Sequence, residues 1–559
     1  MLHGVISAAT TAAIAAFQRG DLSHARRLAE DELAKSEQMP LLHHLLGLID
    51  CRLGRFDNGI ARLKRATAAD PGNIAYRIAL LRALIDAGRA AEALELSTPP
   101  AGGSAAELDL WQVRAEAAFH AGDRAEETKA WQKICEARPN DLLAWTSLAR
   151  SHFAQLHLRE AETAYRRAKS IAPMPAVLHG LGLTLERSNQ IEELGILLDE
   201  ALADGVGKTH LVDLSALKAW RSGEYEEAAC IAESIDVRSD PFRLNGLKAK
   251  IADAAGRPTD AFACAIAMNV SVRDLGAWRA RGKAFRSELR SREQAVASWT
   301  SKPLRLPKSE RRSPAFLVGF PRSGTTLADT FLMGHSDVRV LEELSLLEAV
   351  AQTLGGIANL AAASAEELAA ARCEYFKSAD LHVAPDFNGL IVDKMPLNMI
   401  NIPLIASLFP DAPIIFAQRH PCDCVLSAFM QPFMLNPAMA NFLDLVDSAD
   451  LYDAAMQLFS RGRDVAEVTA HTLVYEKLVT DPEAQLRPLI DYLGLSWEAN
   501  LLDHRLAAAR RGPIETPSYD GLSQPLSEHP IGRWRRYEVQ LAPVLPVLLP
   551  WAERLGYRN

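Results

Sequence analysis

A fixed 34-residue step constrains the fold of the first half of the chain more than any other feature. Four glycines lie 34 residues apart, at Gly20, Gly54, Gly88 and Gly122. A second series keeps the same step, through Ala25, Gly59, Ala93, Glu127 and Ala161. Self-similarity at one period predicts a stack of like units, because each unit buries its apolar face only against its neighbours. Generic alanine-rich helices do not produce such a step.

The block at 141–174 shows what one repeat contains. It reads "DLLAWTSLARSHFAQLHLREAETAYRRAKSIAPM". Small residues at Ala149 and Ala161 let two helices approach closely, and Pro173 closes the second helix. The pattern resembles the tetratricopeptide repeat, which is an all-α solenoid. We expect five repeats from about 6 to 175, degenerate repeats up to about 270, and therefore a helical domain over 1–270.

The composition of the chain changes after residue 270. Residues 271–300 favour a charged helix, and "SKPLRLPKSERRSP" that follows has the prolines and cations of a linker, predicted over 271–313. From 315 onward short apolar strands alternate with helical stretches, beginning with "AFLVGF", "IVDK" and "APIIFAQR". This order predicts an α/β domain with a parallel sheet over 314–559, where ligands bind at the carboxyl ends of the strands.

The first of these strands leads into a loop that resembles a phosphate-binding loop. Gly319 and Gly324 have the Walker A spacing, but Thr325 and Thr326 stand where that motif has Lys and Ser or Thr. Backbone N–H groups at a helix N-terminus still favour an anion, and Arg322 adds a charge. Without the lysine or a metal-binding Asp, the loop favours a single terminal phosphate or phosphosulfate over a triphosphate with Mg²⁺. A P-loop kinase or NTPase is the disfavoured alternative.

A second anion site is predicted at the end of a later strand. In "FAQRHPCDCVLSAF", Arg419 ends the strand and Ser427 lies on the helix that begins near Pro421. An arginine and a hydroxyl in these positions can clamp a phosphate. Together with the first loop, this motif predicts a nucleotide with two separate phosphates.

With these motifs in order, residues 314–559 resemble the sulfotransferases that use 3'-phosphoadenosine 5'-phosphosulfate, most closely the tyrosylprotein sulfotransferase branch. The resemblance rests on "PRSGTT" (321–326), "VRVLEEL" (338–344), "DKMP" (393–396), "RHPCDCVLS" (419–427), a segment at 475–497, "SYDGLSQP" (518–525) and "GRW" (532–534). It implies that Glu343, in preference to Glu342, is the base that takes the acceptor's proton. It also implies that Lys394 contacts the sulfuryl and bridging oxygens and that Ser518 assists the leaving group.

The resemblance further implies a set of donor-binding residues and no metal. The 5'-phosphate would be held by Arg322, Ser323, Gly324, Thr325 and Thr326, the 3'-phosphate by Arg419 and Ser427, and the rest of the nucleotide by Tyr475 and Arg533. The sequence departs from the family pattern at His420, Cys422, Gln431 and Gln524, and these departures put the strength of 3'-phosphate binding in doubt. His335 is interpreted as a helix-end residue and not as a base.

Composition limits the cellular setting and the partners. The net charge of −9 argues against broad binding to nucleic acid or to a membrane surface. Seven scattered cysteines and the lack of a long apolar run favour a cytoplasmic protein. Solenoids of this kind hold peptides or proteins on a concave face. A peptide or protein tyrosine is therefore the favoured acceptor, while a saccharide or small hydroxyl compound, a homodimer, and a scaffold whose nucleotide-binding domain is inactive stay open.

Overall fold

A computed structural model describes residues 7–35, 39–98, 104–299, 302–505, 507 and 526–558. The chain divides into two compact units, 1–211 and 212–559. Among the described residues, no helix is both long and apolar enough to cross a bilayer. The predicted domain boundaries at 270 and 313 and the cytoplasmic location stay predictions.

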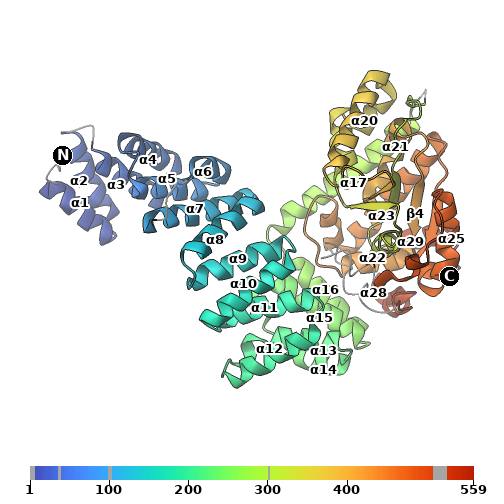
Figure 1. Cartoon of the computed structure of the whole chain (residues 1–559), viewed down its shortest axis with the longest axis horizontal. Helices are drawn as coiled ribbons and strands as arrows, with labels where there is room; N and C mark the ends of the chain where they lie inside the picture. The colour runs from blue at the N-terminus through green and yellow to red at the C-terminus, as the bar shows by residue number, and fades with distance from the viewer. Residues whose placement is uncertain are drawn as a thin grey trace. The chain divides into compact units, whose positions relative to one another are not determined.

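The first unit consists of antiparallel helix pairs, as the 34-residue step predicts (Figure 1). Small residues lie where the two helices of a pair cross. A Cβ on Gly47 would lie 2.7 Å from Leu63 Cγ, and one on Gly59 would lie 2.4 Å from Cys51 Sγ. The helices are α1 (Ala8–Gln18), α2 (Leu22–Leu33), α3 (Pro40–Arg52), α4 (Phe56–Ala69), α5 (Ile74–Asp86), α6 (Ala90–Leu96), α7 (Ala105–Ala121), α8 (Arg124–Ala137), α9 (Leu142–Ala154), α10 (Leu158–Ile171), α11 (Pro175–Arg187) and α12 (Ile191–Ala203).

The turn within each pair depends on one left-handed residue. The four glycines of the 34-residue step have φ between 74° and 82°. The next position of the series, Leu156 (φ 58°), is not a glycine yet adopts the same conformation, and so does Asn189 (φ 60°), 33 residues further on. The left-handed turn between the two helices of a pair is therefore kept even where glycine is replaced by another residue.

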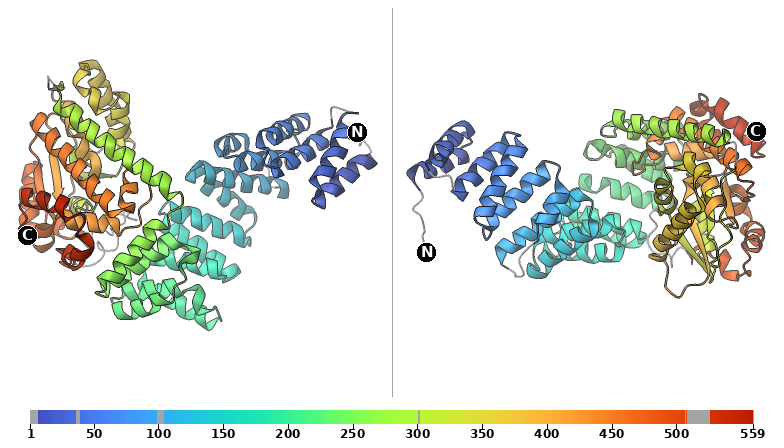
Figure 2. Two further views of the ribbon diagram at one scale, coloured as in Figure 1. Left: turned by 180° about the vertical axis from the view of Figure 1, so that it is seen from behind. Right: turned by 90° about the horizontal axis from the view of Figure 1, so that it is seen from above.

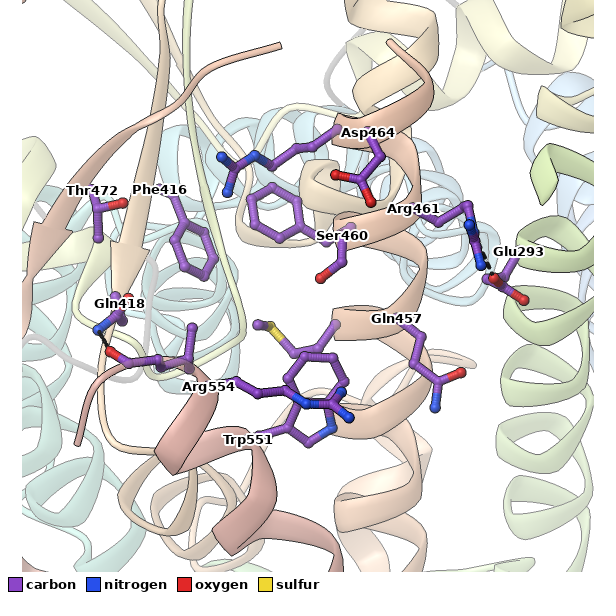
Figure 3. Close-up of a pocket in the computed structure, with 14 residues that line it drawn as sticks. Glu293, Phe416, Gln418, Gln457, Ser460, Arg461, Asp464, Thr472, Trp551 and Arg554 are labelled. Atoms are coloured by element: carbon purple, nitrogen blue, oxygen red, sulfur yellow. Dashed lines mark hydrogen bonds and ion pairs between the residues drawn. The ribbon is translucent and has the colours of Figure 1, made fainter. Parts of the chain in front are cut away.

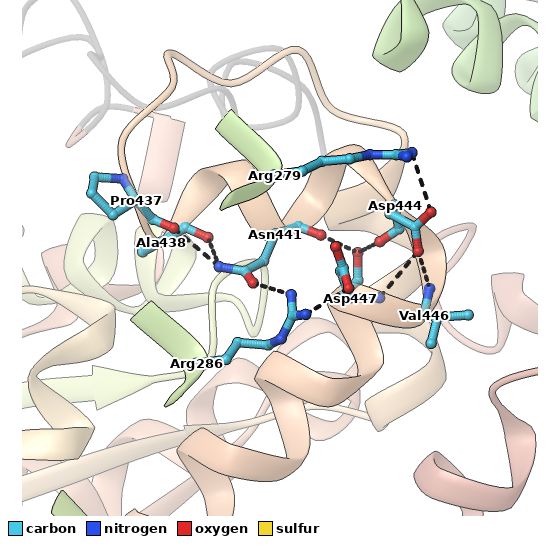
Figure 4. Close-up of polar contacts among 9 residues, drawn as sticks. Arg279, Arg286, Pro437, Ala438, Asn441, Asp444, Val446 and Asp447 are labelled. Carbon is cyan, nitrogen blue, oxygen red and sulfur yellow. Dashed lines mark hydrogen bonds and ion pairs between the residues drawn. The ribbon is translucent and has the colours of Figure 1, made fainter. Parts of the chain in front are cut away.

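The second unit begins with two more helix pairs and a long helix. These are α13 (Val212–Arg221), α14 (Tyr225–Glu233), α15 (Pro241–Ala254), α16 (Pro258–Val270) and α17 (Leu275–Ala297). The long α17 lies beside α23 (Leu445–Val465) (Figure 2). Its Arg286 is buried and donates to Asn441 Oδ1 at 2.5 Å and to Asp447 Oδ1 at 2.6 Å (Figure 4). Helices α13–α17 therefore pack in the same unit as the sheet.

The sheet is parallel, which confirms the predicted fold class. Its strands are β1 (Ala315–Gly319), β2 (Val338–Glu342), β3 (Leu390–Lys394), β4 (Ile414–Gln418) and β5 (His471–Val474), in the order β2-β3-β1-β4-β5. Alternate residues of β1 enter two separate apolar cores, with Phe316 and Val318 on one face and Ala315 and Leu317 on the other. Both faces are thus covered, as parallel sheets require.

Helices and 3₁₀ turns follow the strands as crossovers and cover the two faces. They are α18 (Thr325–Leu332), α19 (Leu346–Thr353), η3 (Ile357–Ala362), α20 (Ala365–Asp380), η4 (Pro396–Asn401), α21 (Ile402–Leu408), α22 (Pro421–Phe429), η5 (Met439–Leu443), α23, α24 (Tyr475–Thr480), α25 (Pro482–Tyr492), η6 (Ala499–Leu502), η7 (Arg533–Tyr537), α28 (Glu538–Leu541) and α29 (Leu545–Arg554). The carboxyl ends of the strands therefore meet at one edge of the sheet, where the predicted motifs lie.

Candidate active site

A buried lysine at the end of β3 gathers three carboxylates. Lys394 is fully buried, and its Nζ lies 2.8 Å from Glu343 Oε1, 3.2 Å from Glu342 Oε1 and 3.4 Å from Asp329 Oδ2. The strand register explains part of this arrangement, because Glu342 pairs with Lys394 across β2 and β3. The N–H of Glu343 also donates to the carbonyl of Lys394 at 2.7 Å. The structure thus brings together two residues that the sequence placed 51 positions apart.

The charge on Lys394 depends on its carboxylate partners. Burial disfavours the ammonium, but Asp329, Glu343 and Glu342 outweigh that effect and raise the pKa of Lys394. Two of the three contacts, to Glu343 and Glu342, are hydrogen bonds from the ammonium, and Asp329 is an ion-pair partner at 3.4 Å. The lysine is therefore held charged and in one orientation.

Asp329 is the member of this cluster that sequence reasoning missed. It is fully buried on α18, four residues after Thr325, which begins that helix. Residues four apart share a helix face, so an acid one turn beyond the anion loop was the available signal. A lone Asp in a short apolar helix is too common a feature to stand out by itself.

Glu343 differs from the other two carboxylates in exposure and in backbone conformation. Its side chain is 41% exposed, against 18% for Glu342 and none for Asp329. Its φ of 51° lies in the left-handed region, which a non-glycine residue adopts at some cost. Of the three, Glu343 is the one most accessible to a group arriving from solvent.

The loop after β1 joins the two predicted anion sites. Arg322, at φ 71°, donates from Nε to Ser427 Oγ at 3.1 Å. In return Arg419 donates from Nη1 to the carbonyl of Arg322 at 3.0 Å. Gly324, at φ 97°, then precedes α18. The arginines and the serine that were predicted to bind two phosphates therefore lie in one hydrogen-bonded group.

Tyr475 packs directly on this loop. A Cβ on Gly324 would lie 2.4 Å from Tyr475 Cδ2, so this position has no room for a side chain. The Arg419 guanidinium lies 4.5 Å from the centre of the Tyr475 ring, a cation–π distance. Burial raises the pKa of Tyr475, and Arg419 and Arg322 oppose that rise. The ring thus fills the space between the loop and the arginine.

Two buried polar atoms at the loop have no hydrogen-bond partner within the described part of the chain. They are Ser323 Oγ and Arg419 Nε. Buried polar groups are normally paired, and both atoms belong to residues that were predicted to contact phosphate. Thr325 and Thr326 are also buried at the start of α18. This donor set fits an anion with phosphate-like oxygens.

The remaining predicted residues have different surroundings. Arg533 forms an ion pair with Asp253 of α15, with Nε 3.0 Å from Oδ2, and its Nη2 lies 3.1 Å from Met430 Sδ. Its role in donor binding stays a prediction. Ser518, the predicted leaving-group residue, and Gln524 lie outside the described residues.

Two of the departures from the family pattern have structural roles. His420 precedes α22, where its Nδ1 accepts from the N–H of Cys422 at 3.3 Å and its ring stacks on Trp534 at 5.0 Å. Burial, together with Arg535 and Arg419, lowers the pKa of His420 to about 4. Burial raises the pKa of the Cys422 thiol to about 12. Both side chains are therefore neutral near pH 7 and add no charge beside Arg419, while Gln431 is half-buried.

His335 lies in the turn after α18. Its Nε2 is 2.8 Å from the carbonyl of Ser496, and its Nδ1 accepts from the N–H of Asp337 at 3.0 Å. These contacts agree with its interpretation as a helix-end residue.

A pocket of about 610 Å³ lies away from these contacts, between β4, β5, α23 and α29 (Figure 3). None of the predicted site residues lines it, and its Arg461 is paired with Glu293 of α17. The candidate site is therefore defined by its side-chain contacts and not by this hollow. No group of three or more His, Cys, Asp or Glu arranged to hold a metal occurs among the residues that the structure describes.

Comparison with known proteins places the C-terminal part of the chain in a family. Residues 314–499 match the model of the sulfotransferase family. The C-terminal part of the chain therefore carries a sulfotransferase-family domain, joined to tetratricopeptide-type helical repeats.

Individual relatives extend this comparison. An uncharacterized protein of Aquifex aeolicus is 27% identical over 248 residues, which cover 42% of this chain and 32% of that protein. Protein-tyrosine sulfotransferase 1 of Danio rerio is 22% identical over 258 residues, 43% of this chain and 71% of the enzyme. The solved sulfotransferase domain of the Synechococcus PCC 7002 olefin synthase is 21% identical, with a TM-score of 0.33 over 46% of this chain and 99% of that one.

Proposed function

We propose that the domain transfers a sulfuryl group from 3'-phosphoadenosine 5'-phosphosulfate to an acceptor hydroxyl. The observation that carries this proposal is the buried Lys394 with its three carboxylates, at the same sheet edge as the loop that links Arg322, Ser427 and Arg419. One part can hold charge on a transferring group, and the other can hold the phosphates of a donor.

The donor set supports a nucleotide with two separate phosphates. The loop lacks the lysine that reaches the β- and γ-phosphates of a triphosphate. Ser323 Oγ in the loop and Arg419 Nε after β4 are instead buried groups that an anion would satisfy. Arg322 would contact the 5'-phosphate and Ser427 the 3'-phosphate, and the hydrogen bond between them links the two proposed phosphate sites.

The residues of the chain divide the chemistry between them. When bound, the donor supplies the sulfuryl group and leaves as adenosine 3',5'-bisphosphate. Glu343 accepts the proton of the acceptor hydroxyl as the oxygen–sulfur bond forms and the bond from sulfur to the phosphate oxygen breaks. Lys394 stabilises the negative charge on the departing oxygen. Lys394 is hydrogen-bonded to Glu343 and Glu342, and Glu343 is the more exposed of these two partners, so it is the one we expect to exchange its contact for the donor.

A peptide or protein tyrosine is the acceptor we propose. The relative from Danio rerio is named a protein-tyrosine sulfotransferase, and helical repeats commonly bind peptides. A phenol has a pKa of about 10, far below that of an alcohol, so a single carboxylate can serve as its base. A cytoplasmic location and a protein partner on the repeats belong to the same proposal.

Ligand-dependent melting tests the donor. We expect adenosine 3',5'-bisphosphate to raise the melting temperature more than ATP with Mg²⁺, because a ligand that binds only the native state stabilises it. Arg322→Ala and Arg419→Ala should each weaken binding by about 1.5–3 kcal/mol. Arg461→Ala, which removes a paired arginine in the separate pocket, is the matched control. A response to ATP alone would overturn the proposal in favour of a kinase or NTPase.

Mass spectrometry tests the acceptor. The full chain, incubated with donor and a tyrosine peptide, should add one SO₃ to the peptide, and a peptide with Phe in place of Tyr should gain none. Modification of a saccharide but of no peptide would overturn the tyrosine assignment and leave the donor assignment standing. Donor binding without turnover on any acceptor would favour the scaffold with an inactive domain.

A further inference from the structure

The last helix pair of the repeats, α15–α16, contacts a C-terminal segment that lies next to Arg419. This segment, Gly532–Tyr537, follows Pro530, whose carbonyl accepts from Arg419 Nη2 at 2.8 Å. The position of Arg419 is therefore tied to the backbone just before the segment.

Asp423 fixes one side of the segment. It lies in the first turn of α22 and is 1% exposed. Its carboxylate accepts from the N–H of Gly532 at 2.9 Å and from the N–H of Trp534 at 2.8 Å. This side of the anchor belongs to the sheet domain itself.

Asp253 of α15 fixes the other side. Its Oδ1 accepts from Tyr537 Oη at 2.6 Å and lies 3.2 Å from Arg536 Nη2, and its Oδ2 lies 3.0 Å from Arg533 Nε. The Asp253 side chain is 13% exposed. One carboxylate thus pairs with two arginines three residues apart and offsets part of their mutual repulsion.

Helix α16 strengthens the same contact. Phe262 stacks on Phe429, the last residue of α22, at 5.1 Å and also lies near Tyr537. Asn269 Nδ2 is buried and donates to the carbonyls of Phe429 at 3.0 Å and of Phe442 at 3.3 Å. The helix pair therefore contacts both the segment and the helix that carries Ser427.

We infer that Asp253 is a positioning residue for donor binding, which acts through Gly532–Tyr537 on Arg419. The last repeat pair is then part of the support of the donor site and not only a surface for partners. The inference rests on the proposed function, in which Arg419 holds the 3'-phosphate. It also gives Arg533 a different role, because a guanidinium paired with Asp253 anchors the segment.

Titration calorimetry of the full chain with adenosine 3',5'-bisphosphate tests the inference. Asp253→Asn should raise Kd about tenfold, comparable to the loss of one charge-assisted hydrogen bond. The matched control is Asp213→Asn in α13, since Asp213 is also buried and pairs with an arginine of the next helix pair, Arg243, at 2.8 Å. That variant should lower the melting temperature and leave Kd unchanged.

A double-mutant cycle separates positioning from general stability. In an Arg419→Lys background, Asp253→Asn should raise the Kd for the bisphosphate by much less than tenfold. The effects of two substitutions are not additive when one residue acts through the other. Full additivity, or an unchanged Kd in Asp253→Asn, would overturn the inference while the proposed function stands. A wild-type chain that does not bind the bisphosphate would overturn both.

Discussion

The turns of the repeats and the loops at the sheet edge use left-handed residues in opposite ways. A Cβ on Gly20, Gly54, Gly88 or Gly122 would meet nothing within 4 Å. A Cβ on Gly324 would collide with Tyr475, and two further left-handed positions, Arg322 and Glu343, are not glycines. In the repeats the left-handed conformation only turns the chain between two helices. At the candidate site it also orients particular side chains toward their partners.

This difference explains why the turns of the repeats accept residues other than glycine. Leu156 and Asn189 keep the repeat turn without glycine, since an open turn imposes only the backbone cost of a left-handed residue. At the sheet edge each such residue also has partners, such as Ser427 for Arg322 and Lys394 for Glu343. Strained residues that have such specific partners are typical of functional sites.

Glu343→Gln should have the largest effect. It keeps the shape of the side chain and removes its basicity, so turnover should fall about 10²- to 10⁴-fold with donor binding nearly intact. Steady-state kinetics and bisphosphate titration measure the two quantities. The matched control, Glu342→Gln, should cost much less, and a larger loss in the control would show that Glu342 is the base.

Gly324→Ala should come next, and it tests the comparison directly. The new Cβ would collide with the Tyr475 ring, and alanine would also have to adopt a left-handed φ. We therefore expect a loss of about 2–4 kcal/mol of stability and weaker donor binding. Gly88→Ala has the backbone cost alone and should lose about 1–2 kcal/mol. Equal losses in chemical denaturation would remove the distinction between the two regions.

Asp393→Asn should change how stability depends on pH. Asp393 is buried with Tyr375 Oη as its donor at 2.8 Å, and burial raises its pKa to about 7 from 3.8. A raised pKa means that the folded state binds the proton more tightly than the unfolded state. The protonated carboxyl of Asp393 therefore contributes to the free energy of unfolding below pH 3.8, and this contribution is lost as pH rises through about 7. Melting temperatures should therefore fall less between pH 5 and 8 in the variant.

A buried aspartate in the repeats is the control for Asp393. Asp50 is paired with Arg26 at 2.5 Å and with Arg62 at 3.2 Å. Asp50→Asn should lower the stability of the first unit, because it replaces the buried carboxylate that contacts both arginines and leaves them only their more exposed partner Glu30. A pH profile in Asp393→Asn identical to that of the wild type would contradict the prediction.

Leu156→Gly should have the smallest effect. Glycine relieves the left-handed strain and loses some packing and chain entropy, so stability should stay within about 0.5 kcal/mol of the wild type. Leu143→Gly, at an exposed position in the first turn of α9, should cost at most about 1 kcal/mol. Urea denaturation compares them, and a larger loss at Leu156 would show that its side chain, and not its backbone, stabilises the turn.

The sequence by itself determined the repeat architecture and the parallel sheet. Both depend on local patterns: a 34-residue period in the first half, and apolar strands followed by helices in the second. It also indicated the loop with Arg322 and the strand-end Arg419, because strand ends of a parallel sheet meet at one edge, while Lys394 was indicated by the resemblance to the sulfotransferases. Such features need no knowledge of which distant residues touch.

Only the tertiary structure decided which side chains complete the site. Asp329 joins Lys394 from another element, and Asp253 reaches Arg533 from 280 residues earlier in the chain. Neither aspartate stands in a motif, and a carboxylate in a helix is ordinarily a solvated residue. Their burial and partners follow from packing between elements that the chain order does not place together, which is why composition and spacing could not reveal them.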